Sequence, residues 1–206
     1  MHKEILDDKQ VQLLKLLPVA KKKWFYLVGG TAIALQIWHR KSIDFDLFRR
    51  SDFESGEIDR ILKNAGTFWS QKYISRTENH TGKINGVNFT FFAFPFDVEA
   101  TVEFESYIKL PDLLSLGAMK AYALGHRSKW KDYVDLYFIL RDHHTISEIS
   151  AKATEIFAGG YNESLFREQL CYHADMNYSE EVEYLIPSPP TDDEVKGFLI
   201  ERALAD

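Results

Sequence analysis

The sequence predicts an α+β protein with two parts, an N-terminal core of helices and strands and a C-terminal helical region. Short apolar and aromatic runs separated by turn residues, a pattern typical of strands, occupy much of the chain up to about residue 108. After Pro111 the apolar residues recur at the spacing of helices. We therefore assign residues 1–108 to the core and residues 109–206 to the helical region. The two are expected to pack together because no Gly/Ser linker separates them.

The elements of the core are predicted from apolar periodicity, capping residues and turn residues. In chain order we first expect a helix over residues 4–17 ended by Pro18, a buried strand over 24–28, and a turn at Gly29-Gly30 that opens a helix over 31–38. A strand over 43–48 and a helix capped by Ser51 or Asp52 and ended by Gly66 follow. The last expected elements are strands near 68–74 and 83–94, with turns at 79–82 and Gly86, and one more strand over 102–108.

The helical region is predicted from longer periodic segments. The expected helices cover residues 113–125, 130–141, 146–157, 163–171 and about 192–204, the last after a rigid connector with Pro187, Pro189 and Pro190. The chain after Arg141 has four Lys/Arg and fourteen Asp/Glu, so this end of the protein is acidic.

Composition narrows the class of protein. With 45% hydrophobic and 14% aromatic residues the chain can fill a packed core, which argues against wholesale disorder. One cysteine, Cys171, excludes an internal disulfide framework and fits a reducing compartment. The first ten residues are rich in charged side chains, unlike the apolar start of a signal peptide. No apolar run approaches the ~20 residues that a membrane span needs. We expect a cytoplasmic protein that does not enter a membrane.

Positive charge is concentrated in two segments of an otherwise acidic chain. The net charge of −6 argues against bulk, non-specific binding of nucleic acid. Residues 21–50 nevertheless hold seven Lys/Arg against two Asp/Glu, and residues 109–131 hold five against one. A positive site on a negative protein attracts an anionic substrate. Ordinary solvated faces would produce the same charge pattern.

Asp44 and Asp46 are the strongest candidates for a metal site. Strand side chains alternate between faces, so both carboxylates point the same way while Ile43, Phe45 and Leu47 point into the core. Two such carboxylates repel each other unless a cation lies between them. Mg²⁺ binds through one or two protein carboxylates together with phosphate oxygens, and paired metals activate a hydroxyl and stabilise a leaving pyrophosphate. The alternative is a solvated strand face.

Gly29, Gly30 and Thr31 are candidates for binding phosphate. Glycine allows close approach of the backbone and unusual φ angles. A turn that opens a helix presents free N–H groups to an anion, and the helix dipole favours the negative charge. The Thr31 hydroxyl is a further candidate donor to a phosphate. A tight turn between a strand and a helix, without a ligand, is the alternative.

The order of strand, Gly-Gly-Thr, helix and Asp-x-Asp resembles the nucleotidyltransferase superfamily that shares the palm of DNA polymerase β. Within it, GGTAIALQIWHRKSIDFDLF closely resembles the AbiEii/AbiGii toxin-like nucleotidyltransferases. The family's downstream Lys-x-x-Ala-x-x-x-x-Arg and Asp-x-x-Asp-Leu resemble KAYALGHRSKWKDYVDL, where the matching residues are Lys120, Ala123, Arg127, Asp132, Asp135 and Leu136. The resemblance covers about residues 24–140.

This resemblance implies a fold and an activity. The fold is a polymerase-β-like mixed sheet with flanking helices. The activity is the Mg²⁺-dependent transfer of a nucleoside monophosphate from an NTP to a hydroxyl acceptor, with an RNA such as tRNA as one candidate acceptor. The resemblance also implies a toxin of a toxin–antitoxin or abortive-infection system, and therefore an antitoxin protein as a partner. A protein hydroxyl or a small molecule stays open as the acceptor.

The matching residues have implied roles. Lys120 and Arg127 lie near one face of a helix, so they can reach the same phosphate tail, and Lys120 would neutralise developing charge. Asp132, which we count with Asp44, Asp46 and Lys120 as catalytic, and Asp135 share a helix face. The pair would orient Lys120, bind Arg127 or reach a metal, or simply hold two helices together. The resemblance gives Arg40 a role at the edge of the active site, whereas His39 fits a structural imidazole because no zinc-type cluster surrounds it.

The sequence departs from the superfamily at the third carboxylate. Many polymerase-β-like enzymes place it on a later strand, but the strand over residues 87–94 contains no acid, and Asp97 and Glu99 follow it too late. Asp132 or Asp135 would replace it, or the site would use two acids only. The alternative function is therefore a nucleotide-binding or regulatory protein with weak or absent turnover. A third reading is an interaction protein that contacts a partner through its acidic helical end.

Overall fold

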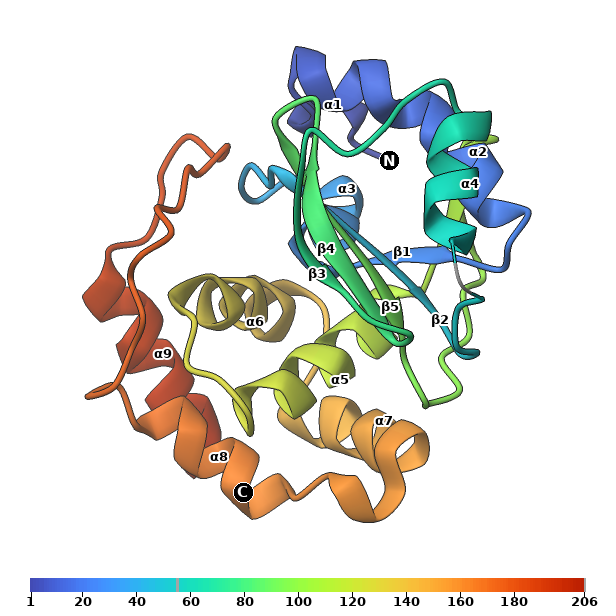
Figure 1. The fold of residues 1–206 in the computed structure, drawn as a ribbon. Coiled ribbons are helices and arrows are strands. Elements are labelled where there is room, and N and C mark those ends of the chain that lie inside the picture. The colour runs from blue at the N-terminus through green and yellow to red at the C-terminus, as the bar shows by residue number, and fades with distance from the viewer. Residues whose placement is uncertain (55, 206) are drawn as a thin grey trace. The chain divides into compact units, whose positions relative to one another are not determined.

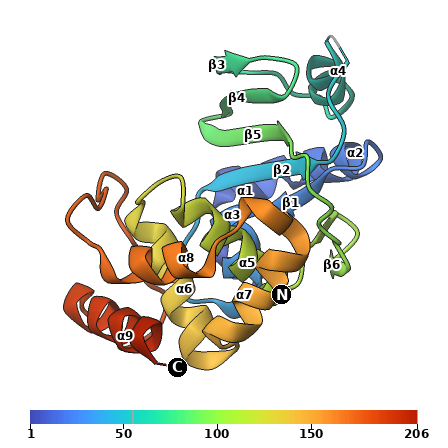
Figure 2. The same ribbon diagram turned by 90° about the horizontal axis from the view of Figure 1, so that it is seen from below.

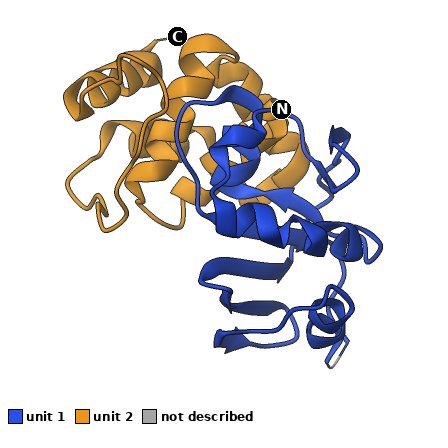
Figure 3. Cartoon of the chain, turned by 90° about the horizontal axis from the view of Figure 1, so that it is seen from above, with its two compact units in different colours: residues 1–112 blue, residues 113–206 orange. Residues whose placement is uncertain are grey.

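A computed structural model describes residues 1–54 and 56–205. Contacts between residues divide the chain into two compact units, Met1–Asp112 and Leu113–Asp206 (Figure 3). The single strand expected over residues 102–108 is instead a hairpin that continues to Leu110, within the first unit. None of the described helices is long and apolar enough to cross a membrane.

The first unit is built on a mixed five-stranded sheet in the order β1-β2-β5-β4-β3, which Figure 2 shows. Strands β2 and β5 run parallel, and all other neighbours are antiparallel. Strands β6 and β7 form a separate antiparallel pair. The strands are β1 (Tyr26–Val28), β2 (Asp44–Arg49), β3 (Gln71–Ser75), β4 (Asn79–Ile84), β5 (Val87–Ala93), β6 (Val102–Phe104) and β7 (Ile108–Leu110). The predicted mixed sheet with flanking helices is confirmed.

The helices of the first unit differ from the prediction at their ends (Figure 1). The helix expected over residues 4–17 is a series of short elements, and Pro18 lies in the first turn of the last of them instead of ending the first. A proline in the first turn loses no hydrogen bond, because that N–H has no partner within the helix. The elements are η1 (Lys3–Ile5), α1 (Asp8–Leu13), η2 (Leu14–Leu16), α2 (Leu17–Lys21), α3 (Gly29–Ile37) and α4 (Glu57–Asn64).

Two turns define the antiparallel hairpins of the sheet. The turn expected over residues 79–82 is wrong, because these residues form part of β4 and the chain reverses between Arg76 and Asn79, whose backbones bond to each other. The hairpin between β4 and β5 turns at Asn85 and Gly86, as expected. Their φ angles of +50° and +81° are those that a two-residue hairpin turn requires.

The N-cap predicted for α4 is also wrong. Gly56, with a φ of +67°, precedes the helix in place of Ser51 or Asp52. A buried ion pair joins this helix to the sheet: both Nη atoms of Arg49, at the end of β2, lie 2.7 Å from carboxylate oxygens of Glu57. This ion pair connects residues eight positions apart and joins the first residue of α4 to the last residue of β2.

The two faces of the sheet have different character because burial alternates along β2 and β5. Phe45 and Leu47 of β2 are fully buried, as predicted, and the Phe45 ring packs against the buried Phe89 ring of β5. Asp44 and Asp46 lie on the opposite, half-buried face. Ile43 precedes the strand and is 53% exposed, so its predicted place in the core is wrong.

The named elements of the second unit are all helices, as predicted. Helices α7 and α9 each begin with a capping box, in which Thr145 pairs with Glu148 and Thr191 with Glu194. Helix α5 packs against α6 and α7, and α8 packs against α9. The helices are α5 (Leu113–Leu124), α6 (Trp130–Asp142), α7 (Ile146–Phe157), α8 (Glu163–Cys171) and α9 (Asp192–Leu204), with a 3₁₀ turn, η3 (Ala158–Gly160), after α7.

Candidate active site

The two aspartates of β2 lie on the half-buried face of the sheet, one pleat apart. In the sheet register Asp46 is opposite Val28 of β1, and Asp44 is opposite Asn88 of β5. The Asn88 amide donates a hydrogen bond to Asp44 Oδ1 at 2.8 Å. The strand alternation therefore places both carboxylates on the same side, where they remain partly accessible.

The diglycine contacts one of these carboxylates directly. Gly29 has a φ of +73°, and a Cβ built on it would lie 2.3 Å from Asp46 Oδ2. The Asp46 carboxylate therefore lies against the backbone at the start of α3, in space that a side chain would fill. Since α3 begins at Gly29 and not at residue 31, the N–H groups of Gly29, Gly30 and Thr31 belong to its first turn and lack partners within the helix. Metal-binding and phosphate-binding candidates thus meet at one place.

Gly30 makes room for an arginine. A Cβ on Gly30 would lie 2.4 Å from Arg40 Nη2 and 3.1 Å from the Ser42 hydroxyl. The Arg40 side chain is 2% exposed, and its Nη1 donates to the Lys41 carbonyl at 2.9 Å. This buried guanidinium supports the first turn of α3 from within the protein. His39, which precedes Arg40 in the sequence, is also buried, as expected of a structural imidazole.

Thr31 joins α3 to β2. Its hydroxyl donates to the Asp44 carbonyl and lies 2.9 Å from the Ser42 hydroxyl, and the residue is 1% exposed. The hydroxyl that the sequence suggested as a donor to phosphate is therefore covered and engaged inside the protein. Its backbone N–H, at the start of the helix, is the part of Thr31 that fits a phosphate.

We expect Gly29→Ala to lower the free energy of unfolding more than Gly66→Ala does. Gly66 is a matched control, because its φ is +67° and its Cβ would meet nothing within 4 Å. Placing alanine in the left-handed region costs about 1–2 kcal/mol at either position. Only at Gly29 must the Asp46 carboxylate also move, which adds about 1–3 kcal/mol of overpacking. Urea unfolding measures both, and equal losses would contradict the contact.

In the second unit, one lysine is held between two buried carboxylates. Lys120 Nζ, on α5, lies 2.5 Å from Asp132 Oδ1 and 2.7 Å from Asp135 Oδ2, both on α6. Asp132 is 2% exposed, Asp135 is 0% exposed and Lys120 is 6% exposed. Arg127 Nε donates to the other oxygen of Asp132 at 2.8 Å. These ion pairs join the two helices.

The charges of this cluster decide the ionisation of Asp132. Burial by itself raises the pKa of its carboxyl, but the nearby positive charges of Lys120 and Arg127 outweigh burial and lower the pKa below its ordinary value. Asp132 is therefore ionised at neutral pH. Of the roles left open for Asp132 and Asp135, the contacts match orienting Lys120, binding Arg127 and holding two helices together.

The side chains of β2 fit a divalent cation. Mg²⁺ is bound in proteins by one or two carboxylates together with oxygens of substrate phosphates, and Asp44 and Asp46 supply two carboxylates on one face beside a helix N-terminus. No group of three or more His, Cys, Asp or Glu side chains with the arrangement of a metal site occurs among the described residues. The candidate donor set among the described residues of β2 therefore consists of the two acids Asp44 and Asp46.

A residue that the sequence analysis missed completes this face. Asn88 points to the same side as Asp44 and binds it, and Thr90 is opposite Asp46. Alternation along residues 87–93 would have indicated both, because each lies between apolar residues that are buried. The register that places Asn88 beside Asp44 depends on a parallel pairing that the sequence does not specify.

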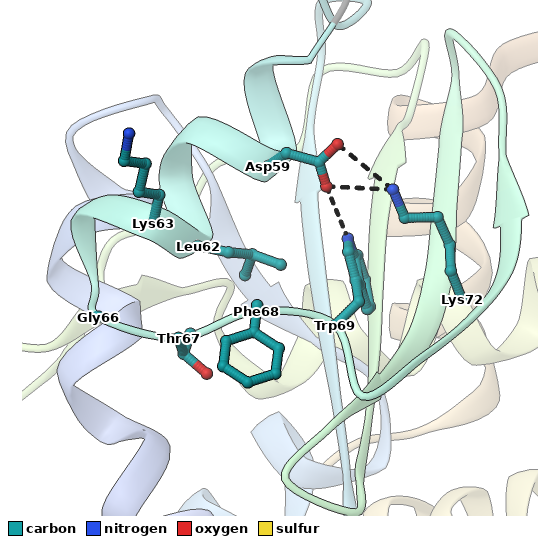
Figure 4. Close-up of a pocket in the computed structure, with 8 residues that line it drawn as sticks. All are labelled: Asp59, Leu62, Lys63, Gly66, Thr67, Phe68, Trp69 and Lys72. Atoms are coloured by element: carbon teal, nitrogen blue, oxygen red, sulfur yellow. Dashed lines mark hydrogen bonds and ion pairs between the residues drawn. The ribbon is translucent and has the colours of Figure 1, made fainter.

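Described residues away from these candidates line further cavities, two of which are well defined. One of about 570 Å³ in the first unit is lined by residues of α4, the loop after it and β3 (Figure 4). Its polar groups bind one another: Asp59 accepts hydrogen bonds from Lys72 and from the Trp69 indole, both at 3.1 Å. The other, of about 670 Å³, lies in the second unit and is lined mainly by α8 and the end of α9. None of the predicted site residues lines either cavity.

Comparisons with known proteins agree on a family and a fold. The family model described as "Nucleotidyl transferase AbiEii toxin, Type IV TA system" matches residues 13–196. An uncharacterised protein of Aquifex aeolicus (strain VF5), aq_aa25, is 30% identical over 146 residues, which are 68% of this chain and 69% of that protein.

Among solved structures, MenT4, a nucleotidyltransferase toxin of Mycobacterium tuberculosis H37Rv, is similar with a TM-score of 0.59 and 12% identity, over 94% of this chain and 81% of that one. JHP933 of Helicobacter pylori is similar with a TM-score of 0.57 and 14% identity, over 95% and 89%. At these identities the two structures show a shared fold.

Proposed function

Because the chain belongs to the family of AbiEii nucleotidyltransferase toxins, we propose that it moves a nucleoside monophosphate from a nucleoside triphosphate to a hydroxyl acceptor, with Mg²⁺ as the cofactor. The observation that carries this proposal is the contact of Asp46 with Gly29 at the start of α3. Carboxylates on one side and free helix N–H groups on the other fit the two parts of a magnesium–triphosphate complex.

In the proposed reaction the acceptor oxygen forms a bond to the α-phosphorus of the triphosphate. The bond from that phosphorus to the bridging oxygen of the β-phosphate breaks, pyrophosphate leaves and the hydroxyl proton is released. Mg²⁺, when bound, offsets the negative charge of the phosphates. Asp44 and Asp46 hold the cation, and the backbone N–H groups of Gly29 and Gly30 orient the phosphates.

The remaining site residues have supporting roles in this proposal. Lys120 and Arg127 are the cations that stabilise negative charge on the triphosphate and its leaving group. Asp132 and Asp135 keep the Lys120 ammonium in one orientation through the contacts described above. Arg40 acts through Gly30, which its guanidinium supports.

An RNA such as tRNA is the proposed acceptor, and an antitoxin of the same system is the proposed partner. The support for the partner is the family, whose description is that of a type IV toxin–antitoxin system. The support for a polyanionic substrate is the positive charge of residues 21–50 and 109–131 in a chain with a net charge of −6. The proposed location is the cytoplasm, because the reaction consumes nucleoside triphosphates.

The deciding experiment incubates the full chain with each α-labelled nucleoside triphosphate, Mg²⁺ and total cellular RNA or lysate. We expect one triphosphate to label one class of acceptor, with loss of labelling when EDTA removes the metal. Ribonuclease treatment then distinguishes an RNA acceptor from a protein, and gel mobility identifies a small molecule. Binding of a triphosphate without label in any acceptor would instead favour a nucleotide-binding protein of the same fold. The neutral Asn88 beside Asp44 is the observation that favours this second candidate.

A further inference from the structure

The strand next to the two aspartates presents an amide where a third acid would complete the site. Strands β2 and β5 are parallel neighbours, and their register puts Asn88 directly opposite Asp44. Both side chains lie on the half-buried face. The Asn88 Nδ2 donates to Asp44 Oδ1 at 2.8 Å. An ionised carboxylate only accepts hydrogen bonds, so this contact determines that the NH₂ group of Asn88 faces Asp44.

An amide and a carboxylate at this position have opposite effects on Asp44. The amide satisfies one oxygen of Asp44 and restricts the rotation of the carboxylate. A carboxylate would repel Asp44 in the absence of a cation and would add a third anionic ligand in its presence. Replacing a residue that donates a hydrogen bond to a metal ligand changes the metal affinity by about 10–100-fold.

The other acids considered for the site are already engaged. Asp132 and Asp135 are both bound to Lys120 in the second unit, and Asp132 also to Arg127. In the first unit, Asp44 and Asp46 are the only acids on this face of β2, whose residues are all described. A second divalent cation beside the first would add two positive charges, and Asn88 supplies no negative charge to offset them.

We propose that Asn88 is a positioning residue that orients Asp44 and limits the site of Asp44 and Asp46 to one divalent cation; this inference rests on the proposed function. The consequence is that this protein uses a single protein-held cation where a three-carboxylate site would hold two. The capacity of the site follows from one residue of β5, and changing that residue changes the number of cations bound.

The test is a titration of the full chain with Mn²⁺ alone, in which electron paramagnetic resonance measures the free ion. Mn²⁺ suits carboxylate sites as Mg²⁺ does and has its own spectrum. We expect one Mn²⁺ per wild-type chain. Asn88→Ala keeps one site and weakens it about tenfold, because Asp44 loses its hydrogen bond. Asn88→Asp binds two.

A matched control is Thr81→Val, which removes a hydroxyl from β4 on the same face. The Thr81 hydroxyl binds Asn79, not an aspartate. We expect its Mn²⁺ affinity to stay within about twofold of the wild type, because no metal ligand loses a hydrogen bond. If Asn88→Asp does not fold, the affinity of Asn88→Ala decides the question.

The outcomes separate the inference from the proposed function. Two equally tight sites in the wild type, or unchanged binding in Asn88→Ala and Asn88→Asp, would overturn the role of Asn88. In that case, a loss of Mn²⁺ binding in the Asp44→Asn variant would still support the metal site. No Mn²⁺ binding by the wild type, or binding that both Asp44→Asn and Asp46→Asn leave unchanged, would overturn the metal site and the proposed function with it.

Discussion

Asp44→Asn and Asp46→Asn are each expected to lower nucleotidyl transfer about a thousandfold, because in the proposed function each substitution removes a carboxylate that holds the Mg²⁺. The amide is close in size to the carboxylate, and both positions lie on the half-buried face of β2, so the fold should persist. Removing one of two neighbouring negative charges also relieves repulsion in the metal-free protein. Initial rates of label transfer and the thermal midpoint of unfolding measure the two effects.

Asp97→Asn is the control for this pair. Asp97 belongs to the same unit, its side chain is 80% exposed and it forms an ion pair with the exposed Arg50 at 2.9 Å. Exposed pairs contribute about 0–1 kcal/mol, so neither stability nor transfer should change appreciably. Transfer that survives in both Asp44→Asn and Asp46→Asn would defeat the assignment of the active site to β2.

Lys120→Met is expected to destabilise the second unit by about 3–5 kcal/mol, because it leaves two buried carboxylates without their shared counter-ion. Asp135 is fully buried, and Asp132 keeps only its contact with Arg127. The same substitution should abolish transfer if Lys120 also stabilises charge on the triphosphate. A single variant cannot separate these two causes.

The triple variant Lys120→Met, Asp132→Asn, Asp135→Asn separates them. It removes the positive charge together with both negative ones, and replacing a whole buried ion cluster is often neutral for stability. We expect urea unfolding to show most of the lost stability restored while transfer stays absent. If nucleotidyl transfer returned together with stability in the triple variant, the role of Lys120 would be structural alone.

Lys131→Met is a matched control in the same unit. Lys131 belongs to α6 as the two aspartates do, and it pairs at 3.2 Å with Glu180, which is partly exposed. A partly exposed pair of this kind contributes about 1 kcal/mol or less. If Lys131→Met lost as much stability as Lys120→Met, the effect would not be specific to the buried ion pairs of Lys120.

Local interactions made much of the secondary structure predictable. Helices α7, α8 and α9 begin and end where the periodic pattern places them. The capping pairs Thr145–Glu148 and Thr191–Glu194 connect residues three positions apart, so the sequence contains them directly. The shared face of Asp44 and Asp46 is likewise a property of any strand.

Errors occurred where a local signal competed with a distant partner. Residues 79–82 contain Asn, Thr and Gly, which favour a turn, but pairing with β5 on one side and β3 on the other makes them a strand. Pro18 stops a helix in isolation, yet here it lies in the first turn of α2, where its missing N–H loses no hydrogen bond. Propensity is a weak prior that tertiary contacts override.

The amino-acid sequence by itself determined the chemistry of this protein: two acids on one strand face, a diglycine before them and a downstream lysine with two more acids. Only the tertiary structure decided which of these groups touch. The Asp46 carboxylate lies on Gly29, Asn88 binds Asp44 from 44 residues away, and Lys120 is enclosed by Asp132 and Asp135. The reason is that contacts between elements depend on sheet register and helix packing, which residues far apart in the chain set jointly.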